Sequence, residues 1–266
     1  MRHLVMYGLF CSLIAGTSGC KKSVEIIAHR GASYLAPENT MASVMLGWEK
    51  DADVEVDVHL SRDNRIVVIH DASTKHITGT DLKVKETNSR ELRKLDYGSF
   101  KGQEFAGERL PFLANVLKTI PPERKLYVEI KCGKEILHVL SRLIIESGRM
   151  SQIVIIGFDI EIVTSSKQLI HVPTYWLKGT EKVKETEEWI PHDPNLVQMA
   201  KDRGLDGLDV HYAGVTKEFV DAVKAAGQKL YVWTVDDPDE ARRLIKLGVS
   251  GITTNRPAWL REQIED

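Results

Sequence analysis

Short apolar runs alternate with longer segments of helical periodicity along most of the chain. Runs rich in Val, Ile, Leu and aromatic residues are typical of buried strands. They cover residues 24–28, 53–59, 66–69, 125–130, 153–157, 172–177, 207–210, 229–235 and 251–254. Helical patterns cover residues 40–50, 112–120, 134–147, 160–166, 194–203, 217–226, 238–247 and 257–264. This regular alternation predicts an α/β protein with a parallel sheet.

The number of strand–helix units favours one α/β architecture. Roughly eight units in about 245 residues match the size of a (β/α)8 barrel, the TIM barrel. A doubly wound open sheet is the main alternative. Residues 72–111 break the rhythm, because this polar stretch contains only a short predicted helix at 89–95. A structureless loop of that length is unusual, so we expect a small insertion after the second strand, beside the site.

The first twenty residues have a composition of their own. Arg2 and His3 precede the apolar residues 4–15, a run shorter than the ~20 residues that span a bilayer. This pattern predicts a signal peptide over residues 1–19. The small residues before Cys20 resemble a bacterial lipoprotein cleavage site, although Thr17 replaces the usual leucine.

We therefore expect export to the cell envelope, periplasmic or outer membrane, with a lipidated Cys20 as anchor on the extracytoplasmic face. Ordinary secretion with cleavage nearby is one alternative, and a buried N-terminal helix is another. One domain would follow, over residues 23–266.

Composition and charge limit the partners of that domain. The net charge is −2, without the basic excess of nucleic-acid-binding proteins, so no nucleic-acid partner is expected. Contact with a membrane is expected only through the lipid anchor, and the oligomeric state is left open. Of the three cysteines, Cys11 leaves with the signal peptide and Cys20 carries the lipid. Cys132 then has no partner for an intramolecular disulfide.

Acidic residues alternate with valine in the segment DVEVDVH of the second predicted strand. Because successive side chains of a strand point to opposite faces, the valines would face the outer helices. Glu55, Asp57 and His59 would then point into the barrel or its mouth. Glu129 and Lys131 share a face of the next strand in the same way. Inward carboxylates are costly unless they are paired or bound to a cation. This oxygen-rich group predicts a site for Ca²⁺ or Mg²⁺, and salt bridges within a polar barrel layer are the alternative.

Two histidines end predicted strands near these carboxylates. His29 follows the first strand, and His70 follows the run at residues 66–69. A lone histidine is more often structural, but two histidines beside three carboxylates favour catalysis. Imidazole exchanges protons near neutral pH, so the pair is predicted to act as acid and base.

Nine short segments together resemble the glycerophosphodiester phosphodiesterase family. They run in family order over about residues 24–260: HRGAS (29–33), PENT (37–40), EVDV (55–58), VVIHD (67–71), EL (91–92), PFL (111–113), EIK (129–131), YVWTV (231–235) and GITTNRP (251–257). Each segment alone is weak, whereas the set is specific.

The resemblance implies a TIM barrel with a short insertion after the second strand. It implies hydrolysis of glycerophosphodiesters to sn-glycerol 3-phosphate and an alcohol. It also implies one divalent cation held by Glu55, Asp57 and Glu129, with His29 and His70 as the acid/base pair. By the same resemblance, the neighbouring glycerol hydroxyl of the substrate attacks phosphorus to give a cyclic phosphate that water opens. Direct attack by water is the alternative.

Two segments depart from the family pattern. Gly157 precedes Phe158 where the family commonly has serine. Residues 74–78 read TKHIT where a member often has Leu-x-Arg-Thr-Thr after the His-Asp pair. These departures bear on substrate choice more than on the chemistry.

Further residues are expected to bind the substrate. Arg30 and Lys131 would stabilise the negative charge of the phosphate, and Gly31 would let the phosphate approach. For Lys131, an ion pair with a glutamate is the alternative. Glu38 is expected to bind or orient the metal cluster, and simply holding Arg30 is the alternative.

Aromatic and polar side chains complete the expected pocket. Trp233, with Phe158 or Tyr175, would form an apolar wall against the glycerol carbons, and core packing is the alternative for each. Asp209 and His211 share one face of the sixth strand, where they line the pocket or form an ordinary ion pair.

Two other functions fit parts of the pattern. A phospholipase C- or D-like barrel acting on intact lipids would be favoured by a large apolar face on the insertion, but residues 72–111 hold only isolated Phe100 and Phe105. A non-catalytic, phosphodiester-binding envelope lipoprotein would have lost a metal carboxylate or a catalytic histidine, and all five are present. The sequence thus favours a metal-dependent hydrolase of small-molecule glycerophosphodiesters.

Overall fold

The computed structural model describes residues 24–265. The predicted signal peptide and the lipidation site at Cys20 lie outside these residues. No helix in the described part of the chain combines the length and the apolar character that a membrane span needs.

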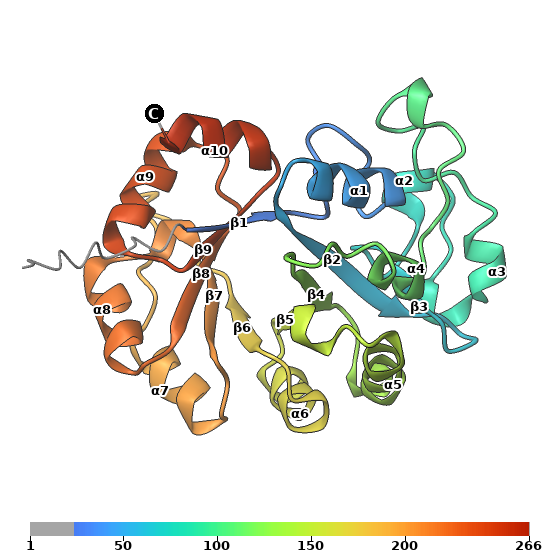
Figure 1. Ribbon diagram of the computed structural model, residues 1–266. Helices are drawn as coiled ribbons and strands as arrows, with labels where there is room; N and C mark the ends of the chain where they lie inside the picture. The colour runs from blue at the N-terminus through green and yellow to red at the C-terminus, as the bar shows by residue number, and fades with distance from the viewer. Residues whose placement is uncertain (1–23, 266) are drawn as a thin grey trace, which may run out of the picture.

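Eight parallel strands form a closed barrel (Figure 1). They are β1 (Glu25–Ala28), β2 (Asp53–Leu60), β4 (Leu126–Ile130), β5 (Ile153–Gly157), β6 (Thr174–Lys178), β7 (Gly207–His211), β8 (Lys229–Trp233) and β9 (Gly251–Thr254). β1 pairs with both β9 and β2, so the first strand joins the last. This closure confirms the predicted TIM barrel and excludes the doubly wound sheet, whose outer strands would have free edges.

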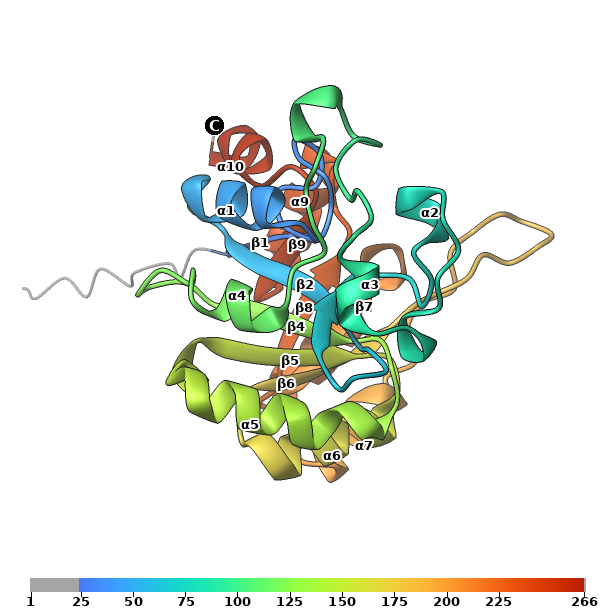
Figure 2. The same cartoon turned by 90° about the vertical axis from the view of Figure 1, so that its right-hand side faces the viewer.

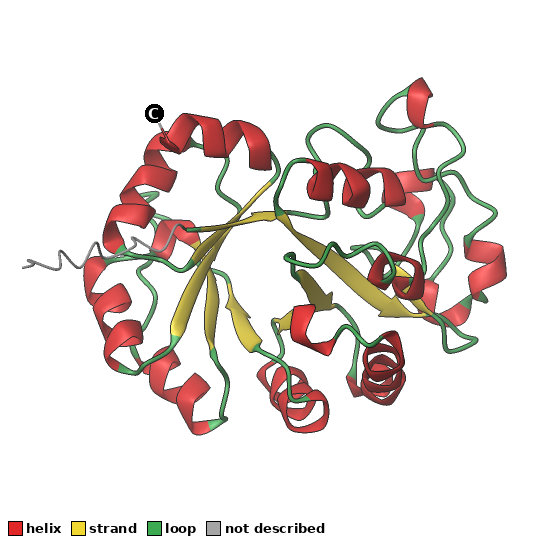
Figure 3. Ribbon diagram, viewed as in Figure 1, coloured by secondary structure: helices red, strands yellow, loops and turns green. Residues whose placement is uncertain are grey.

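Helices surround the barrel on its outside (Figure 3). They are α1 (Met41–Glu49), α4 (Leu113–Leu117), α5 (Leu137–Ser147), α6 (Ile160–Ile170), α7 (Asn195–Asp202), α8 (Lys217–Ala225), α9 (Pro238–Leu247) and α10 (Pro257–Glu265). Side chains of Thr40, Asp159, Thr216 and Asp237 cap the N-termini of α1, α6, α8 and α9. α6 is longer than the predicted 160–166, because the buried Ile170 continues its apolar face.

The outer layer of the core lies between strands and helices. Val54, Val56 and Val58 of β2 are fully buried in one cluster with Leu113 of α4 and Leu140 of α5. The prediction for β2 is therefore confirmed. Its valines face the helices, and the residues between them face the barrel interior.

Tyrosines fill the N-terminal part of the barrel interior. Tyr127, Tyr175 and Tyr231 are buried there, and the ring centroid of Tyr231 lies 5.7 Å from that of Tyr127 and 4.7 Å from that of Tyr175. The hydroxyls of Tyr127 and Tyr231 donate to Oε2 of Glu25, at 3.0 and 3.2 Å. Tyr175 belongs to this layer rather than to the predicted apolar wall, because it does not line the cavity.

The strand β3 (Ile66–Val68) is not a barrel strand. It runs antiparallel to β2, with Val68 opposite Val58. The amide of Ile69 donates to the carbonyl of Asp57 at 3.0 Å, so the chain returns to the level of the carboxylates. His70 reaches the site because this hairpin folds back, and not because it ends a parallel strand.

The insertion after β3 carries short helices (Figure 2) and has a small core of its own. α2 (Lys75–Thr78) and α3 (Ser89–Leu92) lie in it, together with 3₁₀ turns at Val84–Glu86 and Gln103–Phe105. The predicted helix at 89–95 is the shorter α3. The satellite core consists of Val67, Ile69, Val84, Leu92, Tyr97 and Leu110.

Candidate active site

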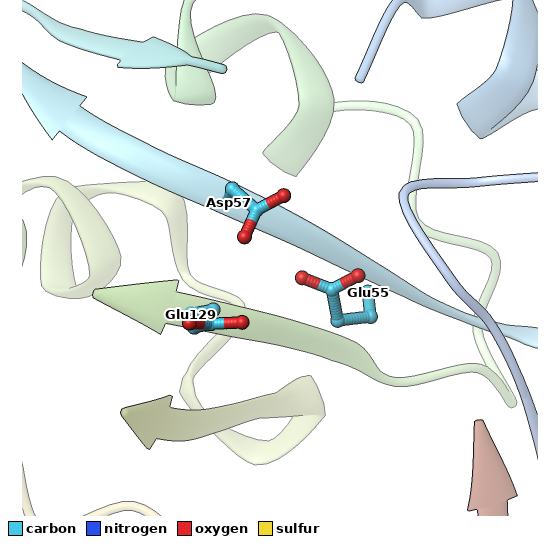
Figure 4. A group of neighbouring side chains, drawn as sticks. All are labelled: Glu55, Asp57 and Glu129. Carbon is cyan, nitrogen blue, oxygen red and sulfur yellow. The ribbon is translucent and has the colours of Figure 1, made fainter. Parts of the chain in front are cut away.

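Three carboxylates predicted to bind a cation meet inside the barrel (Figure 4). Glu55 and Asp57 lie on β2, and Glu129 lies on β4, where it is the register partner of Asp57. One oxygen of each residue lies within 4.8 Å of the others. All three residues are buried. Alternation along β2 and the β2–β4 register are sufficient to bring these side chains together.

The charges of the three carboxylates fit a bound cation. Burial and the neighbouring charges of Asp57 and Glu129 raise the pKa of Glu55 well above its usual value. Burial and Asp57 raise the pKa of Glu129 to about 7. The buried Oε1 of Glu55 has no hydrogen-bond partner. An orphaned acceptor among like charges is the arrangement that a hard cation with oxygen ligands would stabilise.

Two cationic side chains flank the carboxylates. Arg30 Nε lies 3.3 Å from Asp57 Oδ2. Lys131 Nζ lies 2.7 Å from Glu129 Oε1 and 3.7 Å from Asp57 Oδ1. Burial acts to raise the pKa of Asp57, but the charges of Arg30 and Lys131 outweigh it and lower that pKa. Lys131 thus forms the ion pair with Glu129 that was the alternative to substrate binding, and it also lines the cavity.

The loop after β1 positions Arg30 and Asp57. The amide of Arg30, whose φ is +53°, donates to Glu55 Oε2 at 2.8 Å. Asn39 donates through Nδ2 to Asp57 Oδ2 at 2.8 Å and accepts from the Asp57 amide at 3.1 Å. This contact between Asn39 and Asp57 was not predicted from the sequence, although Asn39 belongs to the PENT segment.

Gly31 serves packing rather than phosphate approach. Its φ is +76°, and a Cβ added there would collide with the backbone carbonyl of Ser43 in α1. The amide of Ala32 also donates to that carbonyl at 2.9 Å. Glycine is required because the loop lies directly on α1, which corrects the role expected for this residue.

The two predicted histidines line one cavity. His29 Nδ1 lies 2.8 Å from Asn255 Oδ1, and burial together with the charge of Arg30 lowers the pKa of His29. His70 Nδ1 lies 2.7 Å from Asp71 Oδ1. His59 does not line the cavity; its Nε2 lies 3.0 Å from the carbonyl oxygen of His70. From the sequence, Asn255 was recognised only as part of the GITTNRP segment, and its contact with His29 was not predicted.

The cavity has a volume of about 190 Å³ and a mixed lining. Its walls are formed by His29, Arg30, Glu55, His70, Glu129, Lys131, Ile156, Phe158, Leu177, Asp209, Trp233, Thr234 and Thr253. Phe158 and Trp233 meet edge to face, with centroids 5.6 Å apart, as the predicted apolar wall requires. Phe158 is 46% exposed and therefore lies at the mouth.

Glu38 and His211 lie beside the cavity rather than in its lining. Glu38 Oε1 forms an ion pair with Arg30 Nη1 at 2.8 Å, and Glu38 is not part of the carboxylate group. His211 stacks against Tyr212 and contacts the edge of Trp233. No ion pair joins His211 to Asp209 among residues 24–265, and Asp209 alone of the two reaches the cavity.

Comparisons with known proteins identify relatives over most of the chain. The model of the glycerophosphoryl diester phosphodiesterase family matches residues 29–259. A glycerophosphodiester phosphodiesterase of Caldanaerobacter subterraneus subsp. tengcongensis is 34% identical over 88% of this chain and 95% of its own length. A rat protein named lysophospholipase D is 24% identical over 89% of this chain and 84% of its own.

A solved structure shows the same fold. The phosphodiesterase of Oleispira antarctica, in complex with its product sn-glycerol-3-phosphate, superposes with a TM-score of 0.79. The two proteins are 26% identical, and the match covers 91% of this chain and 97% of the other. By its family match over most of the barrel and by its relative at 34% identity, this chain belongs to the glycerophosphoryl diester phosphodiesterase family.

Proposed function

We propose that this protein hydrolyses glycerophosphodiesters to sn-glycerol 3-phosphate and an alcohol. The observation that carries the proposal is one cavity lined by two histidines, two cationic side chains and two members of the carboxylate group, Glu55 and Glu129. The family and the product complex of the Oleispira relative support the same reaction. The substrate is a small molecule, in agreement with a cavity of about 190 Å³, which is below the roughly 300–1,000 Å³ of pockets for drug-sized ligands.

Glu55, Asp57 and Glu129 would hold one divalent cation, Ca²⁺ or Mg²⁺. A bound cation stabilises charge that develops on the phosphoryl and attacking oxygens. Arg30 and Lys131 add positive charge from two sides of the same cavity. Fixed charges in a site that excludes water are often the largest single contribution to catalysis.

His29 is the general base in this proposal. The pKa of His29 is lowered, which keeps the imidazole neutral. Asn255 Nδ2 donates to Asp236 Oδ2 at 2.6 Å, so Asn255 Oδ1 is the atom that faces His29. The Nδ1–H of His29 donates to it, and the lone pair of Nε2 is free to take a proton.

His70 is the general acid. Its Nδ1–H donates to Asp71, an arrangement that orients the imidazole and stabilises an imidazolium. The neighbouring glycerol hydroxyl gives its proton to His29 and attacks phosphorus. The bond from phosphorus to the alcohol oxygen breaks, and that oxygen takes a proton from His70. Water then opens the cyclic phosphate with the two roles reversed; direct attack by water on the diester is the alternative.

The test is turnover by the purified protein with glycerophosphocholine, glycerophosphoethanolamine and glycerophosphoglycerol. Release of sn-glycerol 3-phosphate is followed with a chelator and after addition of Ca²⁺ or Mg²⁺. We expect release to stop with the chelator and to return with one of the cations. No release from any diester by a folded, metal-loaded protein would overturn the proposal.

We also propose export and anchoring through a lipidated Cys20, which rests on the composition of residues 1–20. Expression in a bacterium fed radiolabelled palmitate should label the wild-type protein and leave Cys20→Ser unlabelled. Label in the variant, or none in the wild type, would contradict the anchor.

A further inference from the structure

Asp209 is a buried carboxyl without a partner. It lies on β7 and is 1% exposed. Its Oδ1 is buried and has no hydrogen bond. No ion pair reaches it within residues 24–265. An unsatisfied buried acceptor costs about 1–3 kcal/mol, so such a group is expected to have a use.

The position of Asp209 aims this carboxyl into the cavity. Its backbone is held between Leu177 of β6 and Tyr231 of β8 by strand pairing. Trp233 Nε1 donates to the carbonyl oxygen of Asp209 at 3.2 Å, which leaves the side chain free. Asp209 lines the same cavity as Glu129 and Lys131. A strand in the middle of the sheet therefore presents this carboxyl rigidly to whatever fills the cavity.

The surroundings of Asp209 fit the end of a polyol. Ile156 and Leu177 supply apolar lining, and Thr253 supplies one hydroxyl. Beyond them the barrel interior is filled by buried tyrosines, among them Tyr175 and Tyr231. A ligand that reaches Asp209 must therefore be short, with carbon atoms for the apolar lining and a hydroxyl donor for the carboxyl. The terminal CH₂–OH of a glycerol group has both properties.

We propose that Asp209 is a specificity-determining residue that accepts a hydrogen bond from the terminal hydroxyl of the substrate's glycerol group. This inference rests on the proposed function and names its substrate class: diesters whose glycerol is fully deacylated. Whether ionised or protonated, the carboxyl retains an acceptor oxygen for this bond.

Lysophospholipids are disfavoured for two reasons. Their terminal oxygen is an ester that has no hydrogen to donate, so Asp209 stays unpaired. Their acyl chain also has no room beside the buried tyrosines. A site built to hydrogen-bond a hydroxyl rejects analogues that lack it far better than an apolar pocket rejects one methylene. The rat relative named lysophospholipase D would then differ from this chain in substrate class.

The experiment compares two substrates that both keep the attacking hydroxyl. One is glycerophosphocholine, and the other is (2-hydroxypropyl)phosphocholine, which lacks only the terminal hydroxyl. We expect the wild type to favour the first in kcat/KM by roughly 2- to 150-fold, the range for one hydrogen bond to a neutral or a charged group. Asp209→Leu should bring this ratio of kcat/KM values close to one, because it lowers kcat/KM for glycerophosphocholine and leaves that for the analogue unchanged. Asp209→Asn, which keeps an acceptor oxygen, should keep most of the ratio.

A matched control and a second measurement make the test decisive. Ile156→Val alters the same lining without removing a hydrogen bond, so it should change kcat/KM for both substrates by the same factor. If Asp209→Leu does not fold, calorimetry replaces it. The binding of sn-glycerol 3-phosphate, and of its analogue without the terminal hydroxyl, is then measured for the wild type and for Asp209→Asn. Equal affinity of the wild type for these two ligands would overturn the inference.

The outcomes separate the two proposals. A wild type that cleaves no diester overturns the proposed function. A wild type that cleaves glycerophosphocholine, with a substrate ratio unchanged in Asp209→Leu, overturns only the role of Asp209. Equal turnover of lysophosphatidylcholine and glycerophosphocholine by the wild type would also overturn it.

Discussion

Lys131 Nζ lies 3.1 Å from Nε2 of His70. A lysine ammonium can only donate, so Nε2 of His70 accepts, and the proton of the neutral imidazole resides on Nδ1 and points to Asp71. Lys131 also lies 2.7 Å from Glu129. One ammonium thus connects the carboxylate group to a histidine of the proposed acid/base pair. A substrate phosphate that drew Lys131 away would free Nε2 of His70, which must then take up a proton from solvent before it can protonate the leaving alcohol.

Replacing the histidines separately should separate acid from base. His29→Ala and His70→Ala should each lower kcat for glycerophosphocholine by roughly 10²- to 10⁴-fold, as is usual for loss of a proton-transfer group. A p-nitrophenyl diester of glycerophosphate has a leaving group that needs no acid. It should restore much of the activity of His70→Ala and little of that of His29→Ala. Rescue of His29→Ala instead would reverse the assignment, and circular dichroism checks that both variants fold.

Loss of one carboxylate should affect stability in two opposite ways. Wild-type protein should gain thermal stability on addition of its cation, because a ligand of the native state stabilises it. Glu55→Gln should lose most of this gain. Without the cation, the same variant should melt no lower than the wild type, because it replaces a carboxyl whose ionisation is opposed by burial and by the charges of Asp57 and Glu129. Thermal melts with chelator and with Ca²⁺ or Mg²⁺ measure both effects, and a full metal response in Glu55→Gln would contradict its role as a ligand.

The two roles left open for Glu38 predict different results. Its ion pair with Arg30 is partly exposed, at 22% for the Glu38 side chain, and such pairs contribute about 0–1 kcal/mol. Glu38→Gln should lower kcat/KM by less than about tenfold and leave the metal-dependent gain in melting temperature unchanged. Arg30→Gln should cost more, because it also removes the charge beside Asp57. A reduced metal response in Glu38→Gln would show instead that Glu38 orients the metal cluster.

The contact between the β2–β3 turn and the insertion should make a pH-dependent contribution to stability through Asp63. Its exposed carboxylate accepts from the amide and the hydroxyl of Ser89, each at 2.8 Å, and from the hydroxyl of Ser61 at 2.7 Å. Slight desolvation opposes these bonds, which nevertheless lower the pKa of Asp63 to about 2. A depressed pKa means that the ionised form stabilises the folded state. The contribution is therefore complete above the usual value of 3.8 and is lost as the pH falls towards 2.

Asp63→Asn should accordingly melt roughly 2–4 °C below the wild type at pH 7, as expected for loss of about 1 kcal/mol in a domain of this size. The difference should shrink between pH 4 and pH 2. Asp63 does not line the cavity, so kcat should stay unchanged. A difference that stays constant down to pH 2 would show that the carboxylate charge is not responsible.

Local patterns were sufficient for the barrel and for most of the cavity wall. The period-2 alternation of β2 places Glu55 and Asp57 on one face whatever surrounds them, because successive side chains of a strand point to opposite sides. Strand–helix alternation predicted the parallel barrel, whose strands end at one edge and so bring His29, Glu129 and Trp233 together. The roles of these residues and the anchor at Cys20 stay predictions for the experiments above.

Tertiary structure alone decided the contacts between distant segments. His70 reaches the cavity because β3 returns antiparallel to β2, and a short apolar run does not reveal its direction. Asn255 holds His29 across 226 positions of the chain, a contact that exists only once β9 pairs with β1. From the sequence, Asp209 was expected either to line the pocket or to form an ion pair with His211, and the structure places it in the cavity lining without that ion pair. Its isolation follows from what the neighbouring strands place around it, because burial and missing partners are properties of three-dimensional packing and not of spacing along the chain.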